Sequence, residues 1–479
     1  MRKHDDYIQN NGLGPIKVAV TRHLIQTPAG LNVPYEGRDP QVAAAFPHGF
    51  PPSYGSGLAC KGLAADGGVE LYCLTDRGPN GDGPAVALAG QKKVESKIFP
   101  APSFTPAVGV LHVTDQGAVL IASMPLKTPD GAFASGLPLP HGAPGSSDEV
   151  PLPDDLNFDA AKATLFSVHG IDSEALAFDP TGKVLWITDE YGPFLLKVDP
   201  GTGMVLARYG PGTGLPAVLA KRRPNRGMEG MTFDPSTSLV HAFLQSPLSD
   251  GKAPYALTGS DEKVERYAAF LRWIVFDPAT QSTVRSLAYP LEHAAFAKGR
   301  TGNAKLGDMV ALGDGKFIVI EQGEGADGSM FNHLMLVDTE GASDITLHGS
   351  ELERSSMHGK AVDGADWQAI KPLRKTLLLD LRQIGWRAEK AEGLALVDAH
   401  TLAMSNDNDF GMKTRLFDTD GKARRGADVT AVTVDTTGAI TDGARAGDTI
   451  RVSPGDLQER SLMLWLLRFD VALAALSSE

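Results

Sequence analysis

The sequence predicts an all-β fold, a single β-propeller of six blades with long insertions between them. Three observations predict it. The 479 residues include 53 glycines and 32 prolines, about 18% of the chain against about 12% in an average protein, which indicates many tight turns. A hairpin pattern recurs five times along the chain. Within each copy, apolar and polar residues alternate as they do in half-buried strands.

The repeated unit is a strand, a tight turn rich in Asp and Gly, and a second strand. In residues 174–190 it reads EALAFDPTGKVLWITDE. The other copies occupy residues 57–76, 229–245, 308–321 and 392–407. One hairpin cannot bury its own apolar face, so the copies must stack or close into a ring. Their wide and uneven spacing favours propeller blades with inserts over a solenoid of short repeats.

The two ends of the chain are expected to close the ring. Residues 17–20 and 462–469 have strand patterns that could pair and complete a further blade. We therefore expect one propeller domain over residues 15–479, preceded by a flexible segment at 1–14. The Pro- and Gly-rich stretch 125–160 is expected to be a surface insert.

A carboxylate opens most copies of the hairpin, and a polar residue closes them. In an antiparallel hairpin these two positions lie at the same end. Four such pairs are expected: Glu174 with Asp189 and Glu190, Glu229 with Gln245, Asp308 with Glu321, and Glu392 with Asn406 and Asp407. If these strands line the channel, the acids form a ring at one of its mouths. Oxygen-only clusters suit Ca²⁺ or Mg²⁺ rather than zinc. The alternative is that the acids cap turns or pair with arginine.

Two acidic loops and several cations add to this mouth. Residues 76–83 and 406–411 have the composition of calcium loops without EF-hand spacing, and Asx turns are the alternative for both. The cations are Arg77, Arg223, Arg226 and Lys390. Guanidinium beside carboxylates and a metal is one way for an acidic protein to hold phosphate. Arg226 could instead only neutralise the acid ring.

Composition excludes several partners. The net charge of −13 argues against nucleic acid, which binds basic surfaces. No apolar run is long enough to span a membrane, and the N-terminus lacks the apolar core of a signal peptide.

Cys60 and Cys73 flank a turn, so they could form a disulfide across a hairpin or remain two reduced thiols. A disulfide would favour an extracytoplasmic location.

The order and number of these motifs resemble the phytase-like family of secreted bacterial proteins, described as the "esterase-like activity of phytase" domain, over about residues 50–415. The motifs that carry the resemblance are TDRGPN at 75–80, SEALA at 173–177, WITDEYGP at 186–193, NRGMEGM at 225–231, LQSPL at 244–248, EGLA at 392–395 and NDNDFG at 406–411. In two copies the sequence departs from the pattern. The copy at 308 opens with Asp instead of Glu, and the copy at 57 has no acid at its start.

This resemblance implies an extracytoplasmic, calcium-associated propeller that hydrolyses phosphate or other esters; a cytoplasmic location is the alternative. We expect a monomer that acts on a small anionic ester. The expected catalytic residues are Glu229, Glu174, Arg226 and Arg77. The expected substrate-binding residues are Arg77, Arg226, Arg223 and Lys390. The expected ligands of Ca²⁺, with Mg²⁺ as the alternative, are Asp76, Glu174, Glu190, Glu229, Asp308, Glu321, Glu392 and Asp407.

Three functions follow from the pattern. The first is a metal-dependent hydrolase of phosphoric esters. The second keeps the site but acts on carboxylic esters or lactones, and a comparison of phosphate and acyl esters separates the two. The third is a non-catalytic ligand-binding propeller with structural calcium, which predicts calcium-dependent melting without calcium-dependent turnover.

Overall fold

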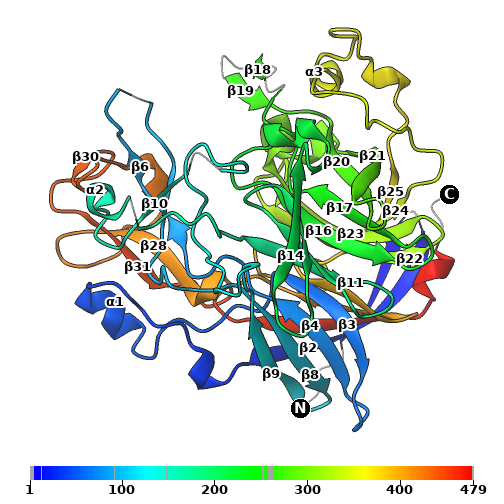
Figure 1. The fold of residues 1–479 in the computed structure, drawn as a ribbon, viewed down its shortest axis with the longest axis horizontal. Helices are drawn as coiled ribbons and strands as arrows, with labels where there is room; N and C mark the ends of the chain where they lie inside the picture. Colours follow the sequence, from blue (N-terminus) through cyan, green and yellow to red (C-terminus); the bar gives the residue numbers. More distant parts are fainter. Residues whose placement is uncertain are drawn as a thin grey trace.

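The computed structural model describes residues 5–11, 13–90, 92–146, 149–162, 164–250, 253–256 and 263–476. Strands dominate it, and they are arranged as a propeller with a smaller lobe beside it (Figure 1). No helix in the described part of the chain is long and apolar enough to cross a membrane.

Five four-stranded blades form the propeller in the described residues. Blade one is β3 (Gly57–Leu63), β4 (Val69–Leu74), β8 (Ala107–Thr114) and β9 (Gly117–Pro125). Blade two is β11 (Ser173–Phe178), β12 (Leu185–Asp189), β13 (Phe194–Val198) and β14 (Val205–Pro211), with the short β15 (Gly214–Leu215) at its edge. Blade three is β16 (Met228–Asp234), β17 (Leu239–Leu244), β20 (Phe270–Asp277) and β21 (Ser282–Pro290). Blade four is β22 (Ala304–Gly313), β23 (Lys316–Glu324), β24 (Met330–Asp338) and β25 (Arg374–Asp380).

The fifth blade joins the two ends of the chain. It contains β26 (Leu394–Asp398), β27 (Thr401–Ser405), β32 (Met463–Phe469) and β2 (Gly14–Gln26), with β1 (Asp5–Asn11) paired to β2. The predicted pairing of the terminal strands is present, with Val18 opposite Phe469. These terminal strands complete the blade that the hairpin at 392–407 begins, and they do not form a further blade. The prediction of six blades is therefore wrong. Each of the five hairpin copies is the inner pair of strands of one blade.

The ring is closed through its inner strands. β3 contacts β11 and β26, β16 contacts β11 and β22, and β22 contacts β26. Buried apolar side chains fill the spaces between neighbouring blades, as in the cluster of Trp186, Ile274 and Phe276 between blades two and three. This packing fixes the five inner strands around one channel, where their first residues face a common mouth.

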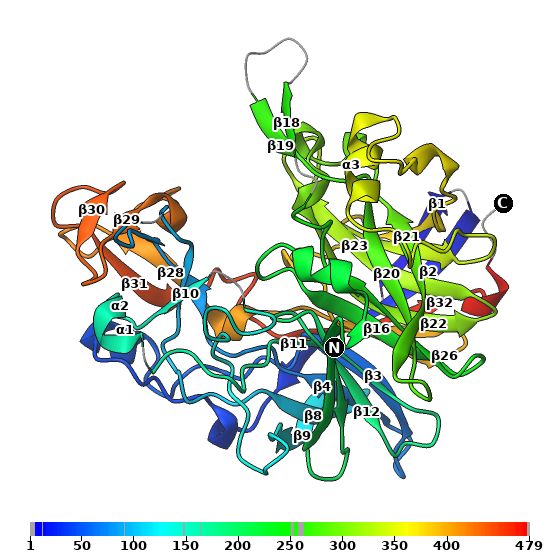
Figure 2. The same cartoon turned by 45° about the horizontal axis from the view of Figure 1, so that its top comes forward.

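A second lobe, which the sequence analysis did not predict, has a hydrophobic core of its own. Its core combines residues from four separate parts of the chain, among them Phe50, Ile98, Val150 and Val434. Its elements are α1 (Pro40–Ala45), α2 (Phe158–Ala161), β5 (Gly81–Asp82), β6 (Ala85–Val86), β7 (Ser96–Ile98), β10 (Val150–Leu152), β28 (Met412–Phe417), β29 (Thr433–Val434), β30 (Ile440–Asp442) and β31 (Thr449–Pro454). Figure 2 shows this lobe standing beside the propeller.

Other segments lie outside both cores. The hairpin of β18 (Ala253–Ala256) and β19 (Lys263–Arg266) extends from blade three, and α3 (Glu351–His358) lies in the insertion between β24 and β25. Short 3₁₀ helices occur at 29–31, 217–221, 293–295, 297–299, 301–303, 367–369, 409–411, 429–431 and 473–475.

Three local expectations change. Residues 5–11, expected to be flexible, form a strand, whereas residues 1–4 and 12 lie outside the described part. The 125–160 insert is only partly a surface loop, because Val150 and Leu152 are fully buried in the second lobe. Cys60 and Cys73 are free thiols. Cys60 lies opposite Leu71 and is exposed, whereas Cys73 lies opposite Leu58 and is buried, so the disulfide alternative is wrong.

Candidate functional site

The hairpin geometry brings acids of different blades to one mouth of the channel. In blade two Ser173 lies opposite Asp189, so the neighbouring Glu174 and Glu190 meet at the same end. In blade three Met228 lies opposite Leu244, which places Glu229 near Gln245. The predicted pairing of strand ends is therefore present in both blades.

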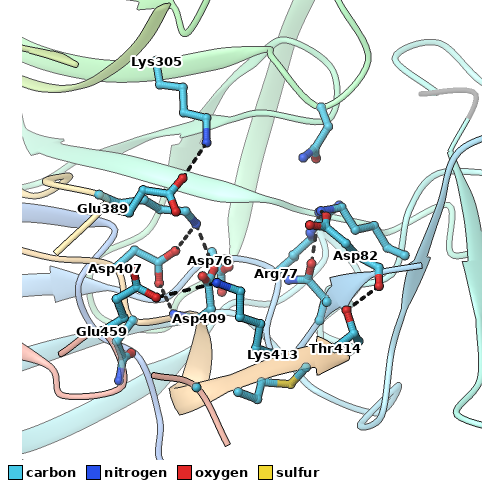
Figure 3. A pocket seen from close by; sticks show the side chains of 18 of the residues that line it. Asp76, Arg77, Asp82, Lys305, Glu389, Asp407, Asp409, Lys413, Thr414 and Glu459 are labelled. Carbon is cyan, nitrogen blue, oxygen red and sulfur yellow. Dashed lines mark hydrogen bonds and ion pairs between the residues drawn. The ribbon is translucent and has the colours of Figure 1, made fainter. Parts of the chain in front are cut away.

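A cavity of about 460 Å³ lies at this mouth, between the propeller and the second lobe (Figure 3). Its lining is almost entirely charged or polar. The lining acids are Asp76, Asp82, Asp172, Glu174, Glu190, Glu389, Glu392, Asp407, Asp409, Asp428 and Glu459. The lining cations are Arg77, Lys97, Arg226, Lys305, Lys390, Lys413 and Arg460. The second lobe contributes Met412, Lys413 and Thr414, so it forms one wall of the cavity.

Three acids of blade two have the arrangement of a cation site. Asp172, Glu174 and Glu190 are buried, and each offers a carboxylate oxygen within 4.8 Å of the other two. Oε1 of Glu190 has no hydrogen-bond partner among the described residues. A buried oxygen normally has a partner, and three carboxylates form the donor set of a hard divalent cation. These residues therefore fit Ca²⁺ or Mg²⁺.

The pKa values of Glu174 and Glu190 reflect their burial first and the crowding of like charges second. Burial, together with the charges of Glu229 and Asp172, raises the pKa of Glu174 well above its usual range. Burial and the charge of Asp172 raise the pKa of Glu190 to about 8, although Arg226 opposes the rise. Both shifts show that the ionised acids lack sufficient positive charge nearby, which a bound cation would supply.

Asp172 was not predicted as a site residue. It precedes the hairpin repeat by two residues, so it lies outside the pattern that pairs the acid opening the first strand with the polar residue closing the second. Its spacing from Glu174, two positions along an extended chain, is the feature that could have identified it, because alternate residues of a strand share a face.

Arg77 holds Asp172 in place. Its Nε lies 3.4 Å from Asp172 Oδ2, and its Nη1 lies 3.0 Å from Glu149 Oε2. A further N–H donates to Asn80, and the guanidinium lies over the rings of Phe99 and Tyr191. The side chain is 4% exposed. Arg77 lines the cavity, but its contacts are those of a residue that positions an acid.

Arg226, Gln245 and Glu229 form a hydrogen-bonded chain. Arg226 Nη1 donates to Gln245 Oε1, and Gln245 Nε2 donates to Glu229 Oε2 over 2.9 Å. Arg226 and Gln245 line the cavity, whereas Glu229 does not. Burial and the charges of Glu190 and Glu392 raise the pKa of Glu229 well above its usual range.

Lys390 pairs with the acids on the other side of the mouth. Its Nζ lies 2.6 Å from Asp407 Oδ2 and 2.8 Å from Asp409 Oδ1. Although Asp407 is buried, the ammonium of Lys390 holds the pKa of its carboxyl below the usual value. Burial raises the pKa of Glu392, against the effect of Lys390. Burial, with the charges of Asp407 and Asp172, raises the pKa of Asp76.

The structure does not bring Asp308 to the cavity. Its carboxylate accepts hydrogen bonds from the backbone N–H groups of Met231, Met309 and Leu394, which lie on three different inner strands. Asp308 is the fifth residue of β22, whereas Glu174 and Glu229 are the second residues of β11 and β16. It therefore lies deeper in the channel and ties blades together.

Glu321 and Arg223 also lie elsewhere. Glu321 accepts hydrogen bonds from Tyr289 and Lys375 between blades three and four. Arg223 donates to the Gly302 carbonyl and lies over the ring of Tyr267. Neither residue lines the cavity.

Lys305 is a cavity residue that sequence reasoning missed. It is the second residue of β22, the position that Glu174 and Glu229 occupy in their strands, and its Nζ lies 3.2 Å from Glu389 Oε1. Figure 3 shows this pair at the edge of the cavity. The position could have been found by aligning strand starts instead of acids.

The two acidic loops differ. In the loop at 76–83 the oxygens have internal partners: Asp76 Oδ1 accepts from the Gly78 N–H, and Asn80 Oδ1 accepts from Arg77. This is the Asx-turn alternative. The loop at 406–411 contains the same kind of turn, because the Asp409 N–H donates to Asp407 Oδ1 over 2.9 Å. It also holds Asn408, whose Oδ1 is buried and has no hydrogen-bond partner among the described residues.

Comparisons with known proteins identify the family of the chain. No curated protein sequence matches the chain. Among solved structures, the chain is similar to the catalytic domain of the GH62 α-L-arabinofuranosidase of Coprinopsis cinerea, with 8% identity, coverage of 95% of this chain and 98% of that one, and a TM-score of 0.34. It is also similar to hydrazine synthase of Kuenenia stuttgartiensis, with 11% identity, coverage of 75% and 94%, and a TM-score of 0.33. Likenesses this distant carry no argument about the reaction.

The family comparison is more specific. The model of the phytase-like family, described as "esterase-like activity of phytase", matches residues 58–410. The match covers well over half of the chain and includes blades one to four, the start of blade five and the predicted acid-bearing hairpins. The resemblance read from the motifs is thereby confirmed, and the chain belongs to the phytase-like family.

Proposed function

We propose that the protein is a Ca²⁺-dependent hydrolase of phosphoric esters that acts in the cavity at the propeller mouth. The observation that carries the proposal is the buried triad of Asp172, Glu174 and Glu190, in which Glu190 Oε1 has no hydrogen-bond partner among the described residues. Cationic side chains line the same cavity. Family membership supports hydrolysis of an ester.

The triad would hold the cation. A bound divalent cation supplies charge neutralisation and Lewis acidity to an ester whose oxygens reach it. Arg77 keeps Asp172 oriented, because its Nε and backbone N–H both face that carboxylate. Asp76, Glu392 and Asp407 are further acids in the lining of the mouth. Mg²⁺ is the alternative occupant of the triad.

Arg226 and Lys390 would bind the substrate's phosphate. Arg226 gives one N–H to Gln245, which fixes its guanidinium at the cavity wall. An arginine carries five donors in a planar fork that matches phosphate oxygens. Lys390 uses two of its three donors for Asp407 and Asp409.

Glu229 would accept the proton of the attacking water, because Glu174 belongs to the triad. Gln245 holds the Glu229 carboxylate in one orientation. Since Glu229 does not line the cavity, it would act through one intervening water, a distance that general bases can bridge.

The family and the calcium-rich setting outside cells also support an extracytoplasmic location, which cell fractionation tests. We also expect a monomer, which size-exclusion chromatography tests.

The test compares two esters in one preparation. With calcium, p-nitrophenyl phosphate should be hydrolysed faster than p-nitrophenyl acetate, and EDTA should abolish the difference. Faster turnover of the acetate in calcium would assign the site to carboxylic esters or lactones. Turnover of neither ester, with calcium still raising the melting temperature, would favour a ligand-binding propeller.

A further inference from the structure

We propose that Lys390 is a built-in cation that takes the place of a second metal ion at the propeller mouth. The wild-type chain then binds one divalent cation there, although the mouth carries acids enough for two. This inference rests on the proposed function, which places the one cation at Asp172, Glu174 and Glu190.

The surroundings of Lys390 have the composition of a cation site. Its Nζ bridges Asp407 Oδ2 at 2.6 Å and Asp409 Oδ1 at 2.8 Å. Glu392 and Asp76 line the same cavity. Clustered carboxylate oxygens are what a hard divalent cation binds, and here an ammonium contacts two of them.

Asn408 is an independent indication that the loop is built for a cation. It lies between Asp407 and Asp409, is 5% exposed and lines the cavity. Its Nδ2 donates to the Arg460 carbonyl, whereas its Oδ1 has no hydrogen-bond partner among the described residues. Amide oxygens of this kind are ordinary Ca²⁺ ligands, and a buried one without a donor is rare.

The two sides of the mouth differ in how their charge is balanced. In the described residues no Lys, Arg or His nitrogen forms an ion pair with Glu174 or Glu190. Of the three acids in the triad, Arg77 forms an ion pair with Asp172. On the other side, Lys390 pairs with two acids at once. A divalent cation bound to the same two carboxylates would lie within a few ångströms of the ammonium, and the repulsion between them would be strong beside the buried carboxylate of Asp407. Lys390 and a second cation therefore exclude one another.

Removal of the Lys390 charge should open the second site. The experiment counts bound calcium by isothermal titration calorimetry, with equilibrium dialysis as a check. It uses the wild type, Lys390→Met, which removes the charge, and Lys390→Arg, which keeps it. Lys305→Met is the matched control, because Lys305 is a cavity lysine whose one ion pair within the described residues is with Glu389. The expected number of bound calcium ions is one for the wild type, two for Lys390→Met, and one each for Lys390→Arg and Lys305→Met.

The second equivalent can be assigned to its ligands. The double variant Lys390→Met with Asp409→Asn should again bind one calcium ion. Asp409 is one of the two acids that lose their ammonium partner in Lys390→Met, so its carboxylate is an expected ligand of the second ion. In the wild-type background Asp409→Asn should leave the count at one, and this variant keeps the test available even if Lys390→Met fails to fold. Loss of one calcium from the Asp409→Asn single variant would overturn the proposal, since a metal would then bind beside Lys390.

The remaining outcomes separate this proposal from the proposed function. One calcium in both the wild type and Lys390→Met overturns the role of Lys390 and leaves the triad site intact. Two in the wild type also overturns it. None in the wild type and one in Lys390→Met supports the role of Lys390 and removes the triad as a calcium site.

Discussion

Arg77 and Asp172 are joined twice: the Arg77 backbone N–H donates to Asp172 Oδ1, and Arg77 Nε lies 3.4 Å from Asp172 Oδ2. The two residues come from blades one and two and are 95 positions apart in the chain. Since Asp172 belongs to the acid triad, this contact links the construction of the propeller to the construction of the site.

Replacement of Arg77 by Met should destabilise the protein. The variant leaves Glu149 and Asp172 buried without their guanidinium, and breaking a buried ion pair costs about 3–5 kcal/mol. Urea unfolding measures the loss. The exposed pair of Arg374 with Asp338 is the control, and Arg374→Met should change stability little. Equal effects of the two substitutions would show that Arg77 has no special role.

Asp308 should prove to be structural. Asp308→Ala leaves the buried N–H groups of Met231, Met309 and Leu394 without their acceptor, at about 1–3 kcal/mol each. Asp308→Asn keeps one oxygen and should cost less. Thermal unfolding ranks the variants, while calcium binding should stay at the wild-type count. Loss of calcium from Asp308→Asn with stability unchanged would restore Asp308 as a metal ligand.

Arg226 should bind the phosphate of the substrate. Arg226→Met removes a charge-assisted contact worth about 1.5–3 kcal/mol, so KM for a phosphate ester should rise at least about tenfold. Arg223→Met is the control, because Arg223 lies outside the cavity against Tyr267, and it should leave KM unchanged. An Arg226→Met enzyme with the wild-type KM would exclude this role.

His241 should make stability depend on pH. Burial lowers its pKa from 6.5 to about 4, and Trp273 Nε1 donates to its Nδ1 over 3.0 Å. As pH falls from 6.5 to 4 the unfolded state binds a proton that the folded state does not, so stability is lost over this range, by about 3 kcal/mol at most. His241→Gln keeps an acceptor for Trp273 and should flatten the pH profile. Parallel profiles of the variant and the wild type would contradict this.

The repeat predicted the propeller well because strand alternation and turn residues are local properties. The blade number was wrong because the terminal strands were assigned to a blade of their own, whereas β32 and β2 complete the one that β26 and β27 begin. The second lobe was missed because Phe50, Ile98, Val150 and Val434 meet only in the tertiary fold. No single stretch of sequence carries its pattern.

The site was predicted in part for a related reason. Strand pairing alone places Glu174 and Glu190 together. Asp308 lies inside the channel because it is the fifth residue of β22. The sequence does not show where β22 begins, so this position could not be predicted. The direction of Glu321 toward Tyr289 and Lys375 likewise depends on packing between neighbouring blades, which no local pattern encodes.

The most direct test of the central claim is a calcium titration of EDTA-stripped protein that follows melting temperature and phosphomonoester hydrolysis together. Both should rise over the same calcium range: hydrolysis should saturate as the site fills, whereas stability should keep rising above Kd, with a gain of about 2.7 kcal/mol at one hundred times Kd. Glu190→Gln should need at least about ten times more calcium for both effects. Hydrolysis that proceeds equally fast in EDTA and in saturating calcium would contradict a calcium-dependent site at the propeller mouth.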